Sequence, residues 1–459
     1  MASHATPMSP GSPLSLRQRA LRAGHWTLAG YAASLGIRLA SSLVMTRLLV
    51  PEMFGVMALV ATIANVIWLL SDIGLGQNII QSRRGAEPAF LDTAWVVQIV
   101  RGLLLWGVAL LLSAGLHVAA LAGMLPADSV YAYPGLPIIL AVASFSVVIQ
   151  SFQSTKTATA YRTFDQKRLT GLELSSQVAG LAVMLAVGVL TRSIWALVAG
   201  GMFAALTKTA LSHAWLHGPA NRFRVEKQAL REVFAFGKWV FVSSAVGVLA
   251  SNGDRLLLGG FVDAQLLGLY AIAALLLGAL EAGVLNFFTA VSLPALSEIA
   301  RKDPSRLREV YRKMRLPADL GLLFVAGGLF AAGRWLIDLL YDPRYAGAGE
   351  MLQVLALSLF VARYALAQQA YLALGRPRYL AVIQGVRMVS LFALVPALLY
   401  LGGLDAAIWA IALHGLATLP FIFRFNSRLG LNDPGLELKV LGALPAGYLC
   451  GALFVRLVA

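Results

Sequence analysis

Arginine side chains stand deep inside several of the long apolar stretches of this 459-residue chain. Arg38, Arg101, Arg363 and Arg387 each lie well within such a stretch. A guanidinium group stays charged at neutral pH, and its planar fork can bind two oxygens of a phosphate or diphosphate at once. Because few acids stand at comparable depth to neutralise these cations, we predict that the four arginines line a water-filled cavity and bind an anionic group.

Each deep charge also has a structural interpretation. A buried cation can pair with an acid, or a long side chain can extend to the membrane surface. We favour this interpretation for Lys208, Lys238 and Asp319, because they lie within one or two turns of a predicted helix end. For Arg38 we favour the cavity, because polar residues share its helix face at a spacing of three or four: Tyr31, Ser34 and Ser41, followed by Met45.

Glu281 is an acid in a run of small and apolar residues, GALEAGVLNFF. Small neighbours allow helices to pack closely. The carboxyl group could carry a proton or a sodium ion and so couple transport to an ion gradient. It could equally pair with an arginine, and the sequence leaves both roles open.

The sequence predicts no enzyme, no cofactor and no metal site. It contains no phosphate-binding nucleotide loop, its six histidines have no metal-ligand spacing, and Cys450 is the single cysteine. The net charge of +15 and the pI near 10.2 would suggest nucleic acid in a soluble protein. Here the cations flank apolar segments, so we predict contact with anionic membrane lipids and no nucleic-acid partner.

The composition predicts a membrane protein, with 59% hydrophobic and 13% charged residues and a mean hydropathy of +0.75. A helix needs about 20 apolar residues to cross a bilayer. Thirteen segments meet this requirement, and whether the last one spans stays open. They are residues 24–48, 53–72, 94–122, 136–154, 169–190, 194–216, 236–252, 266–292, 316–339, 350–373, 379–401, 404–424 and 437–458.

Lys and Arg residues cluster in every second connection between these segments. Such loops stay in the cytoplasm, so the pattern predicts a cytoplasmic N-terminus. The clusters are Arg17/Arg19/Arg22, Arg83/Arg84, Lys156/Arg162/Lys167/Arg168, Arg222/Arg224/Lys227/Arg231, the run from Arg301 to Arg315, Arg376/Arg378 and Arg424/Arg428/Lys439.

A weak internal echo divides the chain. Arg47-Leu48-Leu49 precedes Gly55, and Arg255-Leu256-Leu257 precedes Gly268. The echo is six helices apart, which preserves orientation and predicts a parallel repeat. We therefore predict an all-α polytopic membrane protein with two six-helix bundles, related by a pseudo-two-fold axis, around a central cavity. The bundles are residues 24–220 and 221–425; a disordered cytoplasmic tail (1–23), an interfacial amphipathic helix (about 303–315) and an extra C-terminal membrane segment (426–459) complete the prediction.

Several stretches resemble the polysaccharide-transporter family of oligosaccharide flippases, in the multidrug/oligosaccharidyl-lipid/polysaccharide exporter superfamily. They are RLLVPEMFGVMALVATIANVIWLLSDIGLGQNIIQ, FLDTAWVVQIVRGLLLW, NGDRLLLGGFVDAQLLGLYAIA, SLPALSEIARKDPSRLREVYRK and LIDLLYDPRYAGAGEMLQVLAL, and the resemblance covers about residues 24–425. It implies two bundles that alternate between inward and outward openings. It also implies a polyprenyl-diphosphate-linked glycan as cargo, a bacterial inner membrane as location, and polymerase and export components as partners. Family members typically have twelve or fourteen helices, so thirteen is a departure.

Three alternatives to a flippase stay open at this stage. An ion-coupled multidrug exporter would be expected to line its cavity with acids, whereas the deep set here is chiefly basic. A glycan ligase or polymerase would need a large outward loop with paired catalytic groups, and the predicted outward loops are short. A non-transporting component of a polysaccharide assembly complex would have no use for deep arginines. The sequence does not identify the glycan or a coupling ion.

Overall fold

The computed structural model describes residues 16–70, 74–82 and 84–458, and these residues contain helices but no β-strand. The helices are α1 (Leu16–Leu48), α2 (Pro51–Leu70), α3 (Leu75–Gln81), α4 (Pro88–Leu121), η1 (Val130–Ala132), α5 (Leu136–Ala143), α6 (Phe145–Ser151), α7 (Lys156–Arg162), α8 (Gln166–Thr191), α9 (Trp195–Ala214), α10 (Lys227–Gly259), α11 (Ala264–Lys302), η2 (Pro304–Arg306), α12 (Leu307–Leu340), η3 (Pro343–Tyr345), α13 (Gly347–Ala356), α14 (Leu359–Ala362), α15 (Ala365–Ala373), α16 (Pro377–Leu413), η4 (His414–Thr418), α17 (Leu419–Arg428), α18 (Pro434–Leu441) and α19 (Ala443–Val458).

All thirteen predicted membrane segments fall mainly on helices. Within the described residues, nine helical spans are long and apolar enough to cross a membrane, or ten if the bent pair Leu136–Ser151 and Lys156–Arg162 is one span. One of the nine, Pro377–Arg428, contains two predicted segments. Gly403 separates them with a positive φ of 72°, a backbone conformation that favours glycine. The last predicted segment forms the 25-residue span Pro434–Val458.

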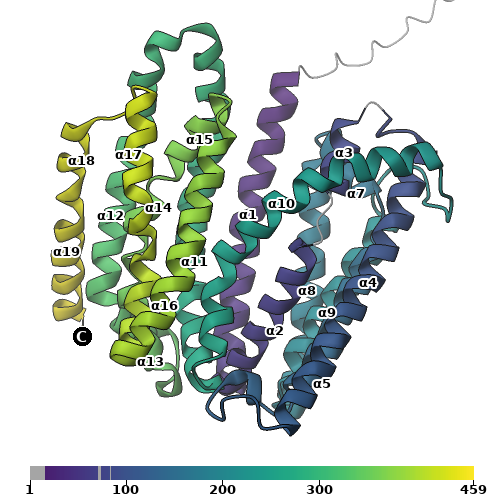
Figure 1. The fold of residues 1–459 in the computed structure, drawn as a ribbon, viewed down its shortest axis with the longest axis horizontal. Helices are drawn as coiled ribbons and strands as arrows, with labels where there is room; N and C mark the ends of the chain where they lie inside the picture. The colour runs from purple at the N-terminus through teal and green to yellow at the C-terminus, as the bar shows by residue number, and fades with distance from the viewer. Residues whose placement is uncertain (1–15, 71–73, 83, 459) are drawn as a thin grey trace, which may run out of the picture.

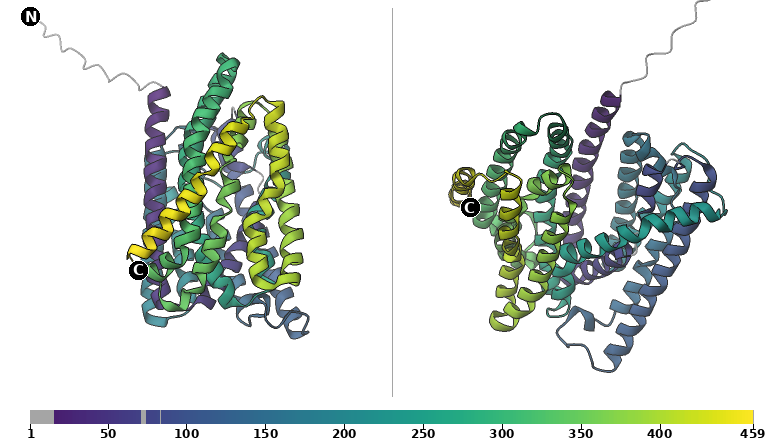
Figure 2. Two further views of the ribbon diagram at one scale, coloured as in Figure 1. Left: turned by 90° about the vertical axis from the view of Figure 1, so that its left-hand side faces the viewer. Right: turned by 45° about the horizontal axis from the view of Figure 1, so that its top comes forward.

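The helices gather into two groups with α1 and α10 between them (Figure 1). The first helix group comprises α2 to α9, and the second helix group comprises α11 to α19. The described chain begins at one end of the molecule and finishes at the other, which requires an odd number of crossings (Figures 1 and 2). The division into two six-helix bundles and the symmetry between them stay predictions.

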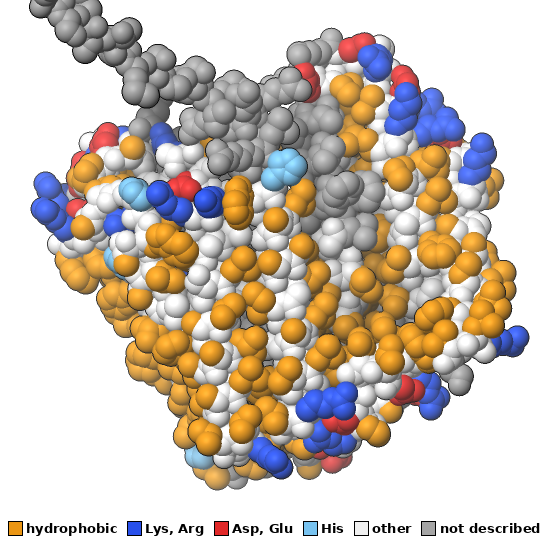
Figure 3. Space-filling view, turned by 180° about the vertical axis from the view of Figure 1, so that it is seen from behind, with side chains coloured by type: hydrophobic (Ala, Val, Ile, Leu, Met, Phe, Trp, Pro, Cys, Tyr) orange, Lys and Arg blue, Asp and Glu red, His pale blue; other side chains and the backbone are white. Residues whose placement is uncertain are grey.

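The surface matches the environment that the composition predicts. Apolar side chains form a broad band around the middle of the face in Figure 3, and Lys, Arg, Asp and Glu gather toward its two ends. Large apolar side chains such as Leu111, Leu190 and Tyr400 are mostly exposed. Such an exposed apolar belt is stable in contact with lipid tails, whereas water would leave it unsolvated.

Two predicted boundaries were wrong. Helix α1 starts at Leu16, inside the predicted disordered tail, because LRQRALRA consists of good helix formers; residues 1–15 lie outside the described part. The predicted interfacial helix at about 303–315 is not a separate element, since α12 continues from Leu307 to Leu340 through Pro317. Leu307 and Tyr311 are buried in a core cluster with residues of α15 and α17, so this face is occupied by protein.

The two halves meet at the glycines of the sequence echo. Gly55 of α2 lies so close to α11 that a Cβ atom there would overlap the carbonyl oxygen of Ala264. A Cβ atom on Gly268 of α11 would overlap the carbonyl oxygen of Pro51. Equivalent residues of a two-fold arrangement meet in this reciprocal way near the axis. The contact therefore supports a repeat axis that passes between α2 and α11.

Helix breaks occur at corresponding places in the two halves. The fourth predicted segment is divided into α5 and α6 and is followed, after a further break, by α7; the tenth is divided into α13, α14 and α15. Non-helical backbone at membrane depth is tolerated where it is buried in protein or lines a cavity. These breaks therefore direct attention to the cavities beside them.

Candidate functional site

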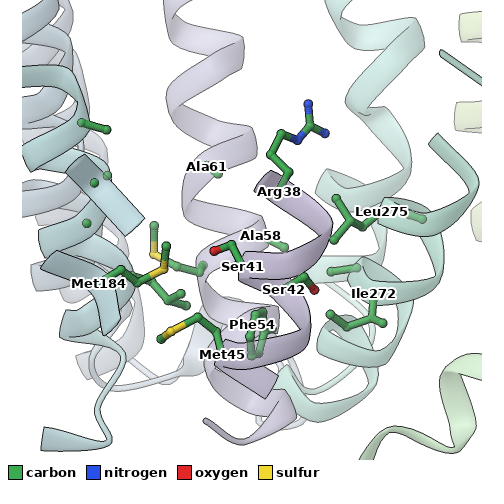
Figure 4. Close-up of a pocket in the computed structure, with 18 of the residues that line it drawn as sticks. Arg38, Ser41, Ser42, Met45, Phe54, Ala58, Ala61, Met184, Ile272 and Leu275 are labelled. Atoms are coloured by element: carbon green, nitrogen blue, oxygen red, sulfur yellow. The ribbon is translucent and has the colours of Figure 1, made fainter. Parts of the chain in front are cut away.

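A cavity of about 790 Å³ lies between the two helix groups. We call it the central cavity. Helices α1, α2, α8, α9, α10 and α11 form its walls, and Figure 4 shows lining side chains that include residues of α1, α2, α8 and α11. Most of its lining is apolar, and no acidic side chain is among the described residues that line it. Its charged residues are Arg38 and Arg255, and its uncharged polar ones are Ser41, Ser42, Thr62, Asn65, Gln177 and Asn252.

Arg38 enters the central cavity from α1, as its helix face predicts. Ser41 and Met45 of the same face line the cavity beside it (Figure 4). Arg38 is exposed, and among the residues that the structure describes it forms no ion pair or hydrogen bond. An arginine held in an apolar wall without an acid leaves its five N–H donors available to an anionic ligand.

Arg255 is a second cavity cation, and the sequence reasoning did not select it. In the sequence it stood out only as part of the Arg-Leu-Leu echo. In the structure it lies inside α10, lines the central cavity and forms no ion pair within the described part of the chain. The sequence signal that could have identified it was its place in the Arg-Leu-Leu echo, where it corresponds to Arg47. Echo residues lie at the junction of the halves, where a shared cavity forms.

Contacts between segments distant in sequence join the two halves beside the central cavity, toward the lower end of the molecule in Figure 1. The α2–α11 crossing at Gly55 and Gly268 lies at this end. The Tyr345 hydroxyl donates to the Leu49 carbonyl oxygen at 2.9 Å, and the Val130 amide donates to the Val262 carbonyl oxygen at 3.0 Å. We call these contacts the outer closure, because the charge pattern predicts that this end faces away from the cytoplasm.

Arg387 and Glu281 lie together in the second helix group. They line two adjoining cavities of about 230 and 170 Å³, and His414 lines both as well. The Arg387 Nε group lies 3.4 Å from His414 Nε2. Since arginine only donates, His414 Nε2 accepts, which leaves its Nδ1–H to donate to the Ile411 carbonyl oxygen at 2.7 Å. No ion pair joins Glu281 to Arg387 in the described structure.

Arg101 does not reach the central cavity. Its guanidinium group stacks on the Trp68 ring, with 4.5 Å between Cζ and the ring centroid. Its Nη2 group donates to the Trp68 carbonyl oxygen at 2.6 Å. The contact joins α4 to the end of α2. Arg101 is thus partly committed to the packing of the first helix group, and a role in binding substrate stays a prediction.

Arg363 is placed differently from the prediction. Its side chain is 2% exposed and lies in a cluster of two arginines and two acids, which we call the buried charge cluster. Arg363 lies 3.2 Å from Asp319 and 2.8 Å from Glu437; Arg315 lies 2.9 Å from Asp319 and 2.6 Å from Glu437. The two positive and two negative charges of the cluster cancel. Arg363 was predicted to line a water-filled cavity, and this prediction is wrong. Acids from α12 and α18 neutralise its charge, so its guanidinium group is not available to bind an anionic ligand.

The structural interpretation of Lys208 and Asp319 agrees with their positions. Lys208 Nζ lies 2.6 Å from Glu173 Oε2, and Asp319 belongs to the buried charge cluster. The side chain of Lys238 lies outside the described residues.

A family model described as "Polysaccharide biosynthesis protein" matches residues 44–346. No protein with a curated description matches the chain in sequence. Among solved structures, the chain is similar to an inward-facing multidrug resistance MATE family transporter of the MOP superfamily, with a TM-score of 0.65, 13% identity, and 91% of this chain and 98% of that chain covered. It is also similar to the lipid II flippase MurJ in an inward closed conformation, with a TM-score of 0.65, 11% identity, and 94% and 92% covered.

Proposed function

Because the chain belongs to the polysaccharide biosynthesis protein family and has the fold of MOP-superfamily transporters, we propose that it translocates a polyprenyl-diphosphate-linked oligosaccharide across the bacterial inner membrane. The observation that carries this proposal is the pair Arg38 and Arg255. Both line the central cavity between the helix groups, and neither has an acid partner in the described part of the chain. A diphosphate can supply the missing negative charge.

The composition of the cavity supports an anionic cargo over a cationic drug. Carrying an unpaired diphosphate through hydrocarbon is prohibitive in free energy. Two guanidinium groups in an otherwise apolar wall offset this cost, since a hydrogen bond to a charged group contributes about 1.5–3 kcal/mol. A cationic drug would meet the same two charges as repulsion. The absence of acids from the described lining removes the groups that would bind such a drug.

The outer closure supports alternating access. In the proposed cycle the cargo enters from the end opposite Gly55 and Gly268. Release on the other side requires α2 and α11 to separate and the contacts at Tyr345 and Val130 to break. The cations must then hold the diphosphate less firmly in the outward state than in the inward one, because a ligand shifts an equilibrium only through its differential affinity.

Glu281 is the proposed coupling residue, and Arg387 belongs to its surroundings rather than to the substrate cavity. Glu281 lines both small cavities of the second helix group with Arg387 and His414. A carboxyl group that is not fixed in an ion pair can gain and lose a proton or a sodium ion. Binding of a proton or a sodium ion at Glu281 would shift the conformational equilibrium of the second helix group, while the cargo occupies the central cavity.

The test is gradient-driven translocation of fluorescent undecaprenyl-diphosphate-linked oligosaccharide in proteoliposomes. Wild-type protein should move the lipid faster when a proton or sodium gradient is applied. Glu281→Gln preserves the side-chain shape and should lose the response to the gradient while still translocating the lipid. Glu350→Gln is the matched control, because Glu350 is exposed and should leave the response intact. Absence of translocation by the wild-type protein would overturn the proposed function, and an unchanged gradient response in Glu281→Gln would overturn the coupling role alone.

A further inference from the structure

A second cavity of about 380 Å³ lies between α1 and the helices α7, α8 and α9 of the first helix group. We call it the polar pocket. Its lining differs from that of the central cavity, because hydroxyl, amide and charged side chains make up most of it. They include Tyr31, Ser34, Gln153, Thr157, Tyr161 and Gln166.

The polar pocket lies beside a broken helix. Helices α5–α6 and α7 are bent by 61° at this point. Side chains of α4 satisfy carbonyl groups beside the break: Gln98 Nε2 donates to the Ser151 carbonyl oxygen at 2.8 Å, and Trp95 Nε1 donates to the Phe152 carbonyl oxygen at 3.2 Å. Gln153 at the break and Thr157 on α7 both line the pocket. Broken helices of this kind line ligand sites in other transporter folds.

The pocket carries no net charge of its own. Its two ionisable wall residues pair with each other, since Lys208 Nζ lies 2.6 Å from Glu173 Oε2. Glu173 Oε1 also accepts from Gln177 Nε2 at 2.9 Å, and Gln177 Nε2 lies 2.7 Å from Ser34 Oγ. This network fixes α1, α8 and α9 around the pocket. An internally neutral site of this kind has no excess charge with which to attract a phosphate.

Four polar side chains of the pocket are not committed to the fold. Tyr31, Gln153, Tyr161 and Gln166 make no side-chain hydrogen bond with any residue that the structure describes. Each amide offers two donors and an oxygen acceptor, and each tyrosine adds a hydroxyl group and an apolar ring face. Convergent donors and acceptors with flat apolar faces match the hydroxyl groups and C–H faces of a sugar ring.

The polar pocket adjoins the central cavity. Ser34 lies about one helical turn, or ~5.4 Å, from Arg38 on the same face of α1. Gln177 lines the central cavity and bonds Ser34 of the polar pocket. A ligand held by Arg38 can therefore extend along α1 into the polar pocket.

From this geometry we propose that the polar pocket binds the sugar residues nearest the diphosphate of the cargo. The inference rests on the proposed function, in which Arg38 and Arg255 bind the diphosphate itself. The two sites then recognise different parts of the cargo. The arginines bind any polyprenyl diphosphate, and the pocket selects for the attached saccharide.

The experiment compares the binding of undecaprenyl diphosphate with and without sugar to the purified full chain in detergent. The sugar-bearing probes carry glucose, galactose or N-acetylglucosamine as their first residue. We define the sugar gain as the Kd for the bare lipid divided by the Kd for a sugar-bearing probe. In the wild-type protein we expect a gain of about ten-fold for at least one probe, as two or three neutral hydrogen bonds would supply.

Two variants test the pocket from different walls. Gln153→Ala/Tyr161→Leu and Tyr31→Leu/Gln166→Ala should each reduce the gain to about one, with the Kd for the bare lipid within about two-fold of wild type, because they leave the cations in place. The matched control is Gln265→Ala/Tyr400→Leu, which changes the same residue types at exposed positions outside both cavities. It should retain the full gain.

The outcomes separate this inference from the proposed function. A wild-type protein that binds the bare lipid without a gain for any sugar overturns the pocket assignment alone. Pocket variants that keep the sugar gain also overturn the pocket assignment. So do pocket variants in which the Kd values for the bare and the sugar-bearing lipid rise by the same factor. A wild-type protein that fails to bind bare undecaprenyl diphosphate instead overturns the proposed function.

Discussion

Two pairs of arginines within the long helices and their breaks have opposite surroundings. Arg38 and Arg255 line the central cavity with no acid partner in the described part of the chain. Arg315 and Arg363 are 1% and 2% exposed, and each lies within 3.2 Å of two carboxylate groups. The same side chain is available for a ligand in the first pair and is part of the fold in the second. Partner acids, rather than depth, decide which role an arginine has.

The paired arginines also hold the thirteenth predicted segment in place. Glu437 on α18 contacts both arginines, and the Tyr364 hydroxyl donates to it at 2.9 Å. Farther along the chain, α19 crosses α12 so closely that a Cβ atom on Gly447 would overlap the carbonyl oxygen of Phe324. The buried charge cluster and this crossing together attach α18 and α19 to the second helix group.

Removing Glu437 should give the largest change in stability. Glu437→Ala leaves the two buried arginines with one acid between them, and breaking a buried pair costs about 3–5 kcal/mol. The Tm in detergent should fall by several degrees. Glu350→Ala is the control, since it removes an exposed pair with Arg334 that contributes about 0–1 kcal/mol. Equal Tm changes in the two variants would contradict a structural role for the cluster.

Forcing α2 and α11 apart should increase access from the outer side to the cavity that holds the unpaired arginines. It should leave the ion pairs of the buried charge cluster intact. Gly268→Val places side-chain atoms against Pro51, and such overpacking costs about 1–3 kcal/mol. We expect the outer closure to weaken. A cysteine introduced at Met57, in a Cys450→Ser background, should then react faster with a membrane-impermeant maleimide added from the outer side.

The control for this labelling is Gly283→Val, on the same helix, because no described atom outside its own helix lies within 4 Å of a Cβ there. It should leave the labelling rate at the wild-type value. Unchanged labelling in Gly268→Val would show that the α2–α11 crossing does not close the cavity.

An exposed ion pair at the outer closure should contribute least. The hydrogen bond from Arg344 holds the pKa of Asp342 below its usual range, and Arg344 also donates to the Thr46 carbonyl oxygen at 3.1 Å. A lowered pKa in the folded state means that the pair stabilises above the unfolded pKa of about 3.9 and loses this effect as the pH falls through the folded value.

The expected loss of folding free energy is below about 1 kcal/mol, because the Arg344 side chain is 42% exposed and solvent screens the pair. It is measured as the difference in Tm between pH 6 and about pH 3 in wild type and in Asp342→Asn. The variant should show the smaller difference. A larger acid-induced loss in Asp342→Asn would contradict the assignment.

Local patterns in the sequence predicted more of this molecule than long-range contacts did. Helical spacing placed Arg38 on a polar face with Ser41, and the structure puts that face in the central cavity. The spans were also predictable, since about 20 apolar residues suffice to identify one. These features depend on residues within a few turns of one another.

The errors concern partners that are far apart in the chain. Arg363 was predicted to face a cavity because the deep cations outnumber the acids at comparable depth, whereas Glu437 reaches it from 74 positions away. Glu437, at the start of the thirteenth predicted segment, was not among the acids considered as partners. Arg255 was missed for a related reason, since only the meeting of α10 with α1 and α2 shows that it lines a cavity.

The most direct test of this account is the Kd of undecaprenyl diphosphate for Arg38→Ala, measured beside Arg47→Ala on the same helix. Arg47 is exposed and lies outside the central cavity, so its removal should leave the Kd at the wild-type value. Losing one charge-assisted contact at Arg38 should weaken binding by about ten-fold or more. The Tm of Arg38→Ala should match that of wild type, because no described acid is left unpaired. An unchanged Kd in Arg38→Ala, or an equal loss in Arg47→Ala, would contradict the claim that an unpaired cavity arginine binds the diphosphate.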